Sequence, residues 1–120
     1  NADGSAVRIR NGIEAITSKK IGVMIIDSHG RAWRMGTIGM TIGLAGVPAL
    51  VDLRGQPDLY DYKLRVTVVA AADELAAGAS LLMGQAAEGT PVVHVRGFPY
   101  ALRESTSQEL VRSKSHDMFR

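Results

Sequence analysis

Residues 27–36, DSHGRAWRMG, combine an acid, a hydroxyl, a histidine and two arginines directly after an apolar run. That run, IGVMII, is short and partly β-branched, as a fully buried strand would be. A carboxylate and a hydroxyl at the end of a strand, here Asp27 and Ser28, offer the oxygen ligands that Mg²⁺ and Mn²⁺ prefer. The same two residues also suit the cap of a turn. The pair alone therefore leaves two interpretations open, a divalent-cation site and a capped turn.

Two arginines in the same segment, Arg31 and Arg34, favour an anionic ligand. A guanidinium presents a planar fork of donors that matches phosphate or carboxylate. Because both lie close in sequence to a metal-type aspartate, they indicate an anion bound beside the cation. The alternative is a solvated loop whose Trp33 packs into the core.

A second polar segment, MGQAAEGTP at residues 83–91, stands between a predicted helix and a predicted strand. Its two glycines, Gly84 and Gly89, allow a loop whose backbone N–H groups turn toward phosphates. Gln85 adds an amide oxygen and Glu88 a carboxylate, and either could bind a metal. Taken alone, the segment fits an ordinary loop with a glycine helix cap better than a binding loop.

The three histidines, His29, His94 and His116, show neither metal-ligand spacing nor a convincing Ser-His-Asp arrangement. His94 falls within a predicted apolar strand, where a structural histidine is the more common case. Asp73 and Glu74 lie in a predicted alanine-rich helix. They could cap that helix, pair with arginine or support a site, and their spacing does not choose among these roles.

The elements that must position these groups follow from hydrophobic periodicity. Helical spacing of apolar residues predicts a first helix from its N-cap Ser5 to Thr17. The apolar strand then ends at Asp27, and residues 28–36 are predicted as a loop between glycines. Glycines at positions 36, 39, 43 and 46 predict a helix with a small-residue packing face, ended by Pro48. Their spacing matches neither the dinucleotide nor the phosphate-loop pattern.

The second half of the chain continues the alternation. Residues 49–55 and 90–97 are predicted as strands, and a short helix is expected near residues 107–111. The clearest helix lies within residues 66–84 and is capped by Gly84. Its apolar stripe consists of Val68, Ala72, Leu75, Ala79 and Leu82. This order of helices and strands predicts one mixed α/β domain, of the α+β kind.

Composition bounds the function only loosely. The 120 residues are 46% hydrophobic and 22% charged with net charge +2, which makes no case for nucleic acid as a partner. The absence of cysteine excludes disulfides and thiolate metal sites and fits the cytoplasm. No apolar run is long enough for a membrane span, and no secretory signal is present. Since the first residue is Asn, we expect a processed chain or a piece of a longer protein.

Four motifs in this order resemble the γ-glutamyl ligase of the deazaflavin coenzyme F420, the coenzyme F420-0:L-glutamate ligase family. The resemblance covers nearly the whole chain. Its motifs are IIDSHGRAWRMG, TIGLAGVPALVDLRG, VTVVAAADELAAGASLLMGQAAEGTPVVHVRG and ELVRSKSHDMFR. It implies a ligase fold that is intertwined as a homodimer. It also implies that GTP and a divalent metal are used to join L-glutamate to a terminal carboxylate of coenzyme F420-0, through an acyl phosphate.

The resemblance also implies site residues. Asp27, Ser28 and Gln85 match the family's metal ligands, for Mg²⁺ or Mn²⁺, with K⁺ as a further cation. Arg31 or Arg34 would bind the anionic coenzyme, glutamate or GTP. The loop around the GTP phosphates would comprise Met83, Gly84, Gln85, Ala86, Ala87, Glu88, Gly89 and Thr90.

The sequence departs from the family pattern at several positions, but none of them is a matched metal ligand. His29 stands where the family usually has Phe, and Ala32 where it usually has Pro. Asp61 replaces a turn glycine, which aspartate tolerates because it visits the left-handed region. The larger departure is length, because residues 1–120 resemble only the C-terminal part of the family protein. Its N-terminal part carries further GTP contacts and another metal-binding aspartate. The chain is therefore expected either to belong to a ligase or to be a metal- and nucleotide-binding or structural fragment without activity of its own.

Overall fold

A computed structural model describes residues 1–117, so the last three residues of the closing motif lie outside the described residues. The chain forms a helix α1 (Ala2–Thr17), a hairpin of β1 (Val23–Arg31) and β2 (Arg34–Ala45), and a helix α2 (Ala71–Met83). Two short strands, β3 (Val51–Asp52) and β4 (Val68–Val69), begin an arm between β2 and α2. Two 3₁₀ turns, η1 (Ser107–Leu110) and η2 (Lys114–His116), close the described chain. The predicted mixed α/β single domain is confirmed.

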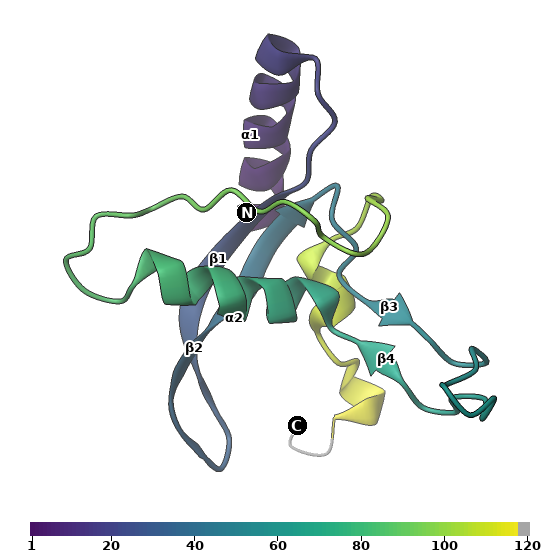
Figure 1. The fold of residues 1–120 in the computed structure, drawn as a ribbon. Helices are drawn as coiled ribbons and strands as arrows, with labels where there is room; N and C mark the ends of the chain where they lie inside the picture. Colours follow the sequence, from purple (N-terminus) through teal and green to yellow (C-terminus); the bar gives the residue numbers. More distant parts are fainter. Residues whose placement is uncertain (118–120) are drawn as a thin grey trace.

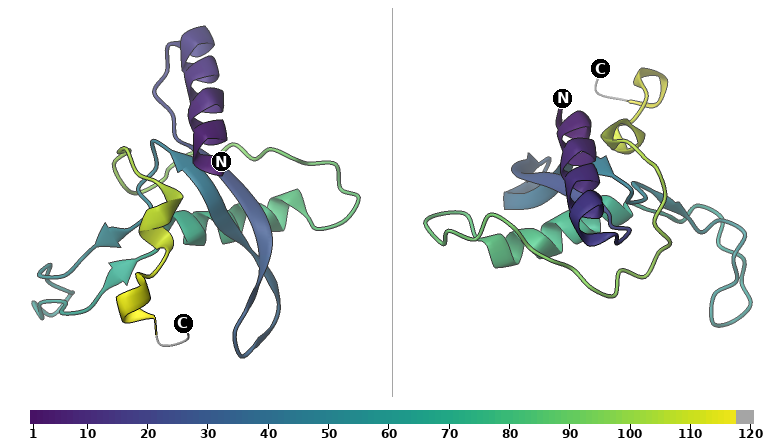
Figure 2. Two further views of the ribbon diagram at one scale, coloured as in Figure 1. Left: turned by 180° about the vertical axis from the view of Figure 1, so that it is seen from behind. Right: turned by 90° about the horizontal axis from the view of Figure 1, so that it is seen from above.

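In space, α2 lies across the β1–β2 hairpin, while α1 projects from the end of the hairpin opposite its turn (Figures 1 and 2). The β3–β4 arm extends away from both helices (Figure 2). Within residues 1–117, no helix is both long enough and apolar enough to cross a membrane.

Helix α1 begins one turn earlier than predicted, so the assignment of Ser5 as its N-cap is wrong. The cap is Asn1, whose Oδ1 accepts a hydrogen bond from the Gly4 N–H at 2.9 Å. Asp3 then falls in the first turn, where a carboxylate is favourable toward the positive end of the helix dipole. The predicted end at Thr17 is confirmed.

The predicted loop at residues 28–36 and the predicted helix after it are both wrong, because this part of the chain is one long hairpin. β1 continues past Asp27 to Arg31, and Arg31 pairs with Arg34 across a two-residue turn. Glycine is a poor helix former, and each one inside a helix costs about 1 kcal/mol relative to alanine. Antiparallel pairing with β1 therefore outweighs the helix-like spacing of these glycines.

Two glycines of β2 do serve packing, as predicted, although on a strand. A Cβ at Gly39 would lie 2.5 Å from Ser80 Cβ of α2. A Cβ at Gly43 would lie 2.6 Å from Ala2 Cβ of α1. Both distances are too short for real atoms, so each helix touches the strand only because a side chain is missing there.

Carboxylates from both helices bind backbone amides of β2. Asp3 Oδ1 accepts from the Leu44 N–H at 2.9 Å, and Asp73 Oδ1 accepts from the Thr41 N–H at 3.0 Å. These bonds satisfy part-buried strand amides that would otherwise need solvent. Asp73, for which the sequence left three roles open, thus joins α2 to β2.

Helix α2 and its cap at Gly84 are confirmed, but its buried face is not the predicted stripe. The predicted stripe begins at Val68, which lies in β4, and ends at Leu82, which is 69% exposed. The buried residues of α2 are Ala71, Ala72, Ala76 and Ser80, so Ala72 is the one member of the predicted stripe that is buried. Small side chains on this face allow the close approach to β2.

The segment after α2 crosses the molecule without regular structure, so the predicted strand at residues 90–97 is wrong (Figure 1). Within residues 49–55, the strand is limited to Val51–Asp52, which pair with β4, and the N–H groups of Leu53 and Gly55 donate to the carbonyls of Thr67 and Leu64 beyond it. The predicted short helix near residue 107 is the 3₁₀ turn η1. Asp61 adopts the expected left-handed conformation, with φ at 61°.

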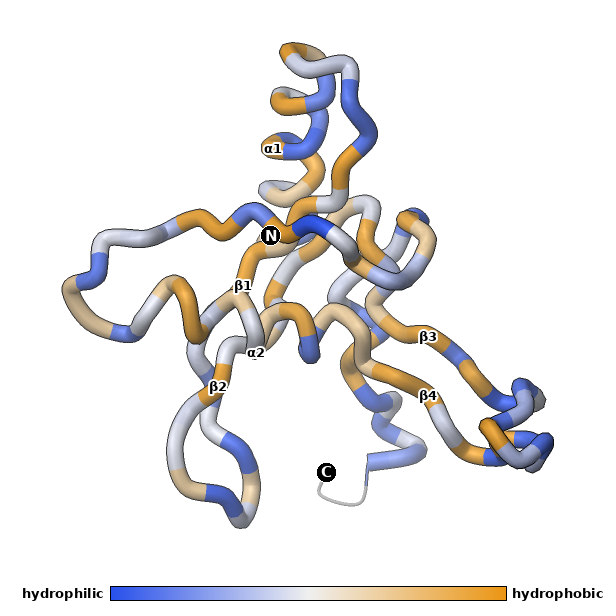
Figure 3. The backbone as a smooth tube through the Cα atoms, viewed as in Figure 1, coloured by the Kyte–Doolittle hydropathy of each residue, from blue (hydrophilic) through white to orange (hydrophobic). Residues whose placement is uncertain are grey.

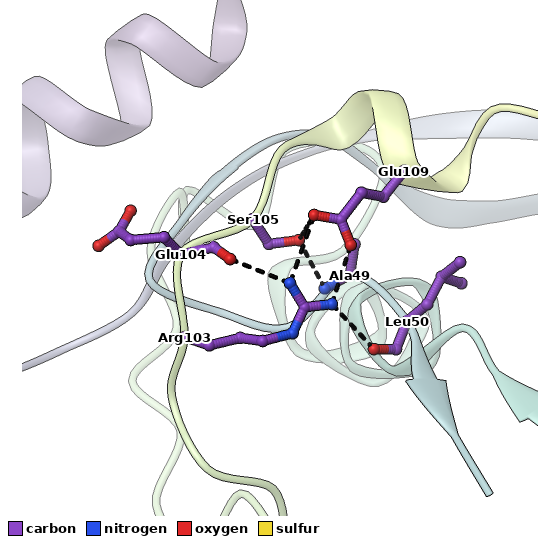
Figure 4. Close-up of polar contacts among 6 residues, drawn as sticks. All are labelled: Ala49, Leu50, Arg103, Glu104, Ser105 and Glu109. Atoms are coloured by element: carbon purple, nitrogen blue, oxygen red, sulfur yellow. Dashed lines mark hydrogen bonds and ion pairs between the residues drawn. The ribbon is translucent and has the colours of Figure 1, made fainter.

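Side-chain bonds rather than strand pairing hold the C-terminal segment. Ser105 Oγ accepts from the Ala49 N–H at 3.1 Å and donates to Glu109 at 2.7 Å. Arg103 donates to the Leu50 carbonyl at 3.1 Å and pairs with Glu109 at 2.8 Å (Figure 4). The pKa of Glu109 is lowered to about 2, first by the Arg103 guanidinium and then by the Ser105 hydroxyl.

The buried core is small. Leu44, Ala49 and Ala72 form its central cluster, against which Met24 and Leu110 pack. Among the described residues, Leu44 is the largest side chain that is almost completely buried. Many large apolar side chains remain exposed along α1, at the hairpin turn and on the arm. Figure 3 shows hydrophobic residues along the backbone of α1 and of the β3–β4 arm.

Candidate functional site

The two polar segments singled out in the sequence meet at one pocket of about 160 Å³ between the hairpin and the end of α2. From β1 come Asp27 and Ser28, which are exposed, and from the end of α2 come Met83, Gly84 and Gln85. The complete lining is Ile26, Asp27, Ser28, Ser80, Met83, Gly84 and Gln85. Residues that are more than fifty positions apart in the sequence thereby line one pocket.

The packing of α2 on β2 explains why they meet. Ser28 pairs with Gly39 across the hairpin, and Gly39 is the position at which Ser80 touches the strand. The helix then ends at Gly84, with φ at 76°, and delivers Gln85 beside the strand. A single missing side chain, at Gly39, thus sets the distance between the two halves of the pocket.

The donor atoms of the pocket suit a hard divalent cation. Asp27 supplies a carboxylate, Ser28 a hydroxyl and Gln85 an amide, all of them oxygen donors of the kind that Mg²⁺ and Mn²⁺ accept. Asp27 Oδ1 accepts from the Ser28 N–H at 2.8 Å, which fixes the orientation of the carboxylate. Within residues 1–117, no three His, Asp or Glu side chains gather in one place, so neutral oxygens must contribute to any metal site here.

The amide of Gln85 is already held in the pocket. Its Nε2 donates to Ser80 Oγ at 2.8 Å, and Ser80 is only 8% exposed. Since an amide has donors on nitrogen and acceptor sites on oxygen, this bond leaves Oε1 as the atom that can bind a cation.

The predicted phosphate loop, Met83–Thr90, is bracketed by two glycines with positive φ, Gly84 at 76° and Gly89 at 67°. Within it, Glu88 turns back on the loop, where its Oε2 accepts from the Ala86 N–H at 2.8 Å. This hydrogen bond lowers the pKa of the Glu88 carboxyl. Glu88 also packs over Gly84, where a Cβ would lie 2.5 Å from Oε2. Its carboxylate therefore braces the loop from within.

Arg31 and Arg34 stand at the far end of the hairpin and do not line the pocket. Arg31 Nη2 donates to the Met35 carbonyl at 3.1 Å, so its guanidinium is bound to the hairpin itself. Arg34 is exposed. Their role toward an anionic substrate stays a prediction. Trp33 is 86% exposed, so the alternative interpretation, in which it packs into the core, is wrong.

The histidines lie away from the pocket lining. His29 is exposed on β1 opposite Ile38, and His94 is exposed in the irregular segment rather than in an apolar strand. His116 Nδ1 lies 2.7 Å from Ser113 Oγ within the turn η2. A second hollow, of about 280 Å³, is lined in part by Asp52, Tyr100 and Arg103 and includes none of the predicted site residues.

Sequence reasoning missed Ser80, although a signal was present. Within residues 75–83, LAAGASLLM, Ser80 is the only side chain with a hydroxyl, an amide or a charge. It lies one helical turn before Gly84, on the face that becomes buried. A lone hydroxyl on the buried face of an alanine-rich helix needs a hydrogen-bond partner, and here the partner is Gln85.

Comparison with known proteins identifies relatives of this chain. The sequence profile of the F420-0:Gamma-glutamyl ligase family matches residues 1–97. A protein of Methanococcus maripaludis (strain C6) named coenzyme F420:L-glutamate ligase is 51% identical over 120 residues, which are 100% of this chain and 48% of that protein. Proteins of the same name from Methanocaldococcus jannaschii and Methanosarcina barkeri are 46% and 40% identical, again over 100% of this chain and 48% of theirs.

The chain thus spans about half the length of the curated relatives it matches. The family profile nevertheless covers both segments of the pocket, from Asp27 and Ser28 to Gln85. On this match, the chain belongs to the F420-0:gamma-glutamyl ligase family.

Proposed function

We propose that this chain provides the C-terminal part of an enzyme that joins L-glutamate to coenzyme F420-0 through a γ-glutamyl amide bond, with GTP as the phosphoryl donor. The observation that carries the proposal is the pocket in which Asp27 and Ser28 face Gln85. The names of the relatives supply the ligase, the coenzyme and glutamate.

The reaction that fits such a site has two steps. A terminal carboxylate of the coenzyme attacks the γ-phosphorus of GTP, which gives an acyl phosphate and GDP. The amine of glutamate then attacks the acyl carbon and releases inorganic phosphate, which leaves the amide. Phosphoryl transfer of this kind depends mainly on positioning and on neutralising phosphate charge.

The residues of this chain would divide the work as follows. Asp27, Ser28 and Gln85 would hold Mg²⁺ or Mn²⁺, which neutralises phosphate charge when bound. Backbone N–H groups of residues 83–90 would bind the GTP phosphates, in a loop braced by Glu88. Arg31 and Arg34 remain candidates for an anionic substrate group, and K⁺ remains a candidate for a further cation.

We also propose that two copies of the chain assemble as a homodimer. Its accessible surface is 8954 Å², against roughly 6,300 Å² for a compact monomer of 12.8 kDa. The radius of gyration, 15.9 Å, likewise exceeds the roughly 13.5 Å of a compact domain of this length. This extended shape, together with the exposed apolar side chains of α1, supports a contact that covers them, such as a second copy of the chain.

A metal- and nucleotide-binding module without catalysis is the second candidate. It is favoured by one observation, that Asp27 is the only carboxylate in the lining of the pocket. Sites for Mg²⁺ with bound phosphates usually use one or two carboxylates, so this pocket is at the lower limit.

Equilibrium binding of GTP with and without Mn²⁺ tests the shared part of both candidates. Asp27→Ala should abolish the Mn²⁺-dependent part of GTP binding. His29→Ala, which changes an exposed neighbour on the same strand outside the pocket lining, should leave it unchanged. If Asp27→Ala binds GTP and Mn²⁺ as the wild type does, the site is wrongly assigned. Release of GDP and phosphate that requires both coenzyme and glutamate then separates the ligase from the binding module.

A further inference from the structure

We propose that Ser80 is a positioning residue, which orients the side-chain amide of Gln85 so that Oε1 faces the bound cation. The inference rests on the proposed function, because it assigns Gln85 as a metal ligand. It concerns a residue that neither the sequence motifs nor the family comparison single out.

The first observation is the hydrogen bond itself. Gln85 Nε2 donates to Ser80 Oγ at 2.8 Å in a part-buried position. A free glutamine amide can rotate to present either its nitrogen or its oxygen to a ligand. Because the nitrogen is engaged by Ser80, the oxygen is the atom left for a cation, and a cation binds only the oxygen.

The second observation is that Ser80 is itself immobilised. Its side chain is wedged against the strand, since a Cβ at Gly39 would lie 2.5 Å from Ser80 Cβ and 3.0 Å from Ser80 Oγ. Its carbonyl accepts from the Gly84 N–H at 3.1 Å, which ties it to the end of the helix. A group that orients a ligand must be held more firmly than the ligand, and the buried Ser80 fulfils this condition for the exposed Gln85.

The third observation links Ser80 to the other side of the pocket. Gly39 pairs with Ser28 across the hairpin, so the strand surface that Ser80 contacts belongs to the same ladder that carries Ser28. Ser80 therefore fixes the position of the Gln85 amide relative to the Ser28 hydroxyl and the Asp27 carboxylate. Removing its oxygen would uncouple the two halves of the site without removing any proposed ligand.

A double-mutant cycle in the chain of 120 residues tests this proposal. It compares Ser80→Ala, Gln85→Ala and the combined variant, with Mn²⁺ alone as the probe. Free Mn²⁺ is measured by electron paramagnetic resonance. Outer groups that orient metal ligands typically contribute 10- to 100-fold to affinity, so Ser80→Ala should weaken Mn²⁺ binding by at least about tenfold. If Ser80 acts through Gln85, the combined variant should bind no more weakly than Gln85→Ala.

Two further variants separate positioning from stability. Ser105→Ala truncates another buried serine, which does not line the pocket, and should lower the melting temperature without changing Mn²⁺ affinity. Ser80→Cys keeps the shape of the side chain but offers only a weak acceptor, so it should weaken Mn²⁺ binding even where folding is preserved. Additive losses in the cycle would instead make Ser80 a direct ligand and would overturn the proposal.

A readout without metal keeps the two proposals apart. The side-chain amide resonances of Gln85 in ¹⁵N-labelled protein should shift and broaden in Ser80→Ala. Unchanged resonances would overturn the positioning role even if Mn²⁺ binds. A wild-type protein that binds no Mn²⁺ would instead overturn the proposed function, while the amide resonances still decide whether Ser80 orients Gln85.

Discussion

Asp3 and Leu44, forty-one positions apart, are joined by a hydrogen bond of 2.9 Å from the Leu44 N–H to Asp3 Oδ1. The same carboxylate accepts from the N–H of Ser107 at 3.1 Å and from its hydroxyl at 2.9 Å. One side chain in the first turn of α1 therefore connects the helix, the core strand and the C-terminal segment. Burial raises the pKa of Asp3, but the hydrogen bonds from Leu44 and Ser107 outweigh it, so the net pKa is lowered.

Replacing Asp3 by alanine should destabilise the fold. The change leaves the part-buried amides of Leu44 and Ser107 without their acceptor, and each such group costs about 1–3 kcal/mol. Urea unfolding at neutral pH measures the loss. Asp58→Ala is the matched control, because Asp58 also accepts from two backbone amides but does so at the exposed tip of the arm. Equal losses in both variants would contradict a connecting role for Asp3.

The ion pair between Glu109 and Arg103 should make the free energy of unfolding depend on pH in the acid range. The pKa of Glu109 is about 2 in the folded protein and 4.5 as its ordinary value. Because the folded value is the lower one, its contribution is fully present above about pH 4.5 and disappears as the pH falls toward 2. Glu109→Gln should therefore flatten the free energy of unfolding against pH in this window.

Thermal unfolding from pH 7 to pH 2 checks that expectation. Glu104→Gln serves as the comparison, because Glu104 pairs with Arg10 through a side chain that is 76% exposed, and ion pairs at the surface contribute little. A Glu109→Gln profile as steep as that of the wild type would place the acid sensitivity elsewhere.

Gly39→Ala should disturb both packing and the site. Its Cβ would meet Ser80 Cβ at 2.5 Å and the Ala76 carbonyl oxygen at 2.6 Å, so α2 must move away from β2. Overpacking of this kind costs about 1–3 kcal/mol. Gly30→Ala is the control on the same hairpin, because its Cβ would meet nothing within 4 Å. Calorimetry should show a clearly lower free energy of unfolding for Gly39→Ala and almost no change for Gly30→Ala.

Assembly should be visible in solution. A homodimer would give a sedimentation mass twice the 12.8 kDa of the chain. Association through exposed apolar side chains such as Ile9, Ile13 and Ile16 should persist at 1 M salt, because salt screens charges and leaves apolar contacts in place. A protein that sediments as a single chain under these conditions would contradict the homodimer.

Local signals were sufficient for several elements. The alanine-rich α2 and its Gly84 cap, the end of α1 at Thr17 and the left-handed Asp61 were all predictable, because helix propensity and turn geometry depend on near neighbours. The absence of a strand at residues 90–97 was not predictable, because an apolar run becomes a strand only where the edge of another strand is free to pair with it. Within residues 1–117, no strand pairs with this segment.

The glycines of β2 show the same division. Their steps of three and four residues are compatible with a helix, and only pairing with β1 makes the segment a strand. The role of these glycines in close packing could nevertheless be predicted from residue type alone.

For the site, the donor atoms can be predicted from residue types alone: a carboxylate at Asp27, a hydroxyl at Ser28 and an amide at Gln85. Folding adds that these donors share one pocket, that Arg31 and Arg34 lie outside its lining, and that Ser80 binds the amide. Donor chemistry belongs to single residues. Their convergence depends instead on the contact between α2 and β2 at Gly39, which joins segments far apart in the chain.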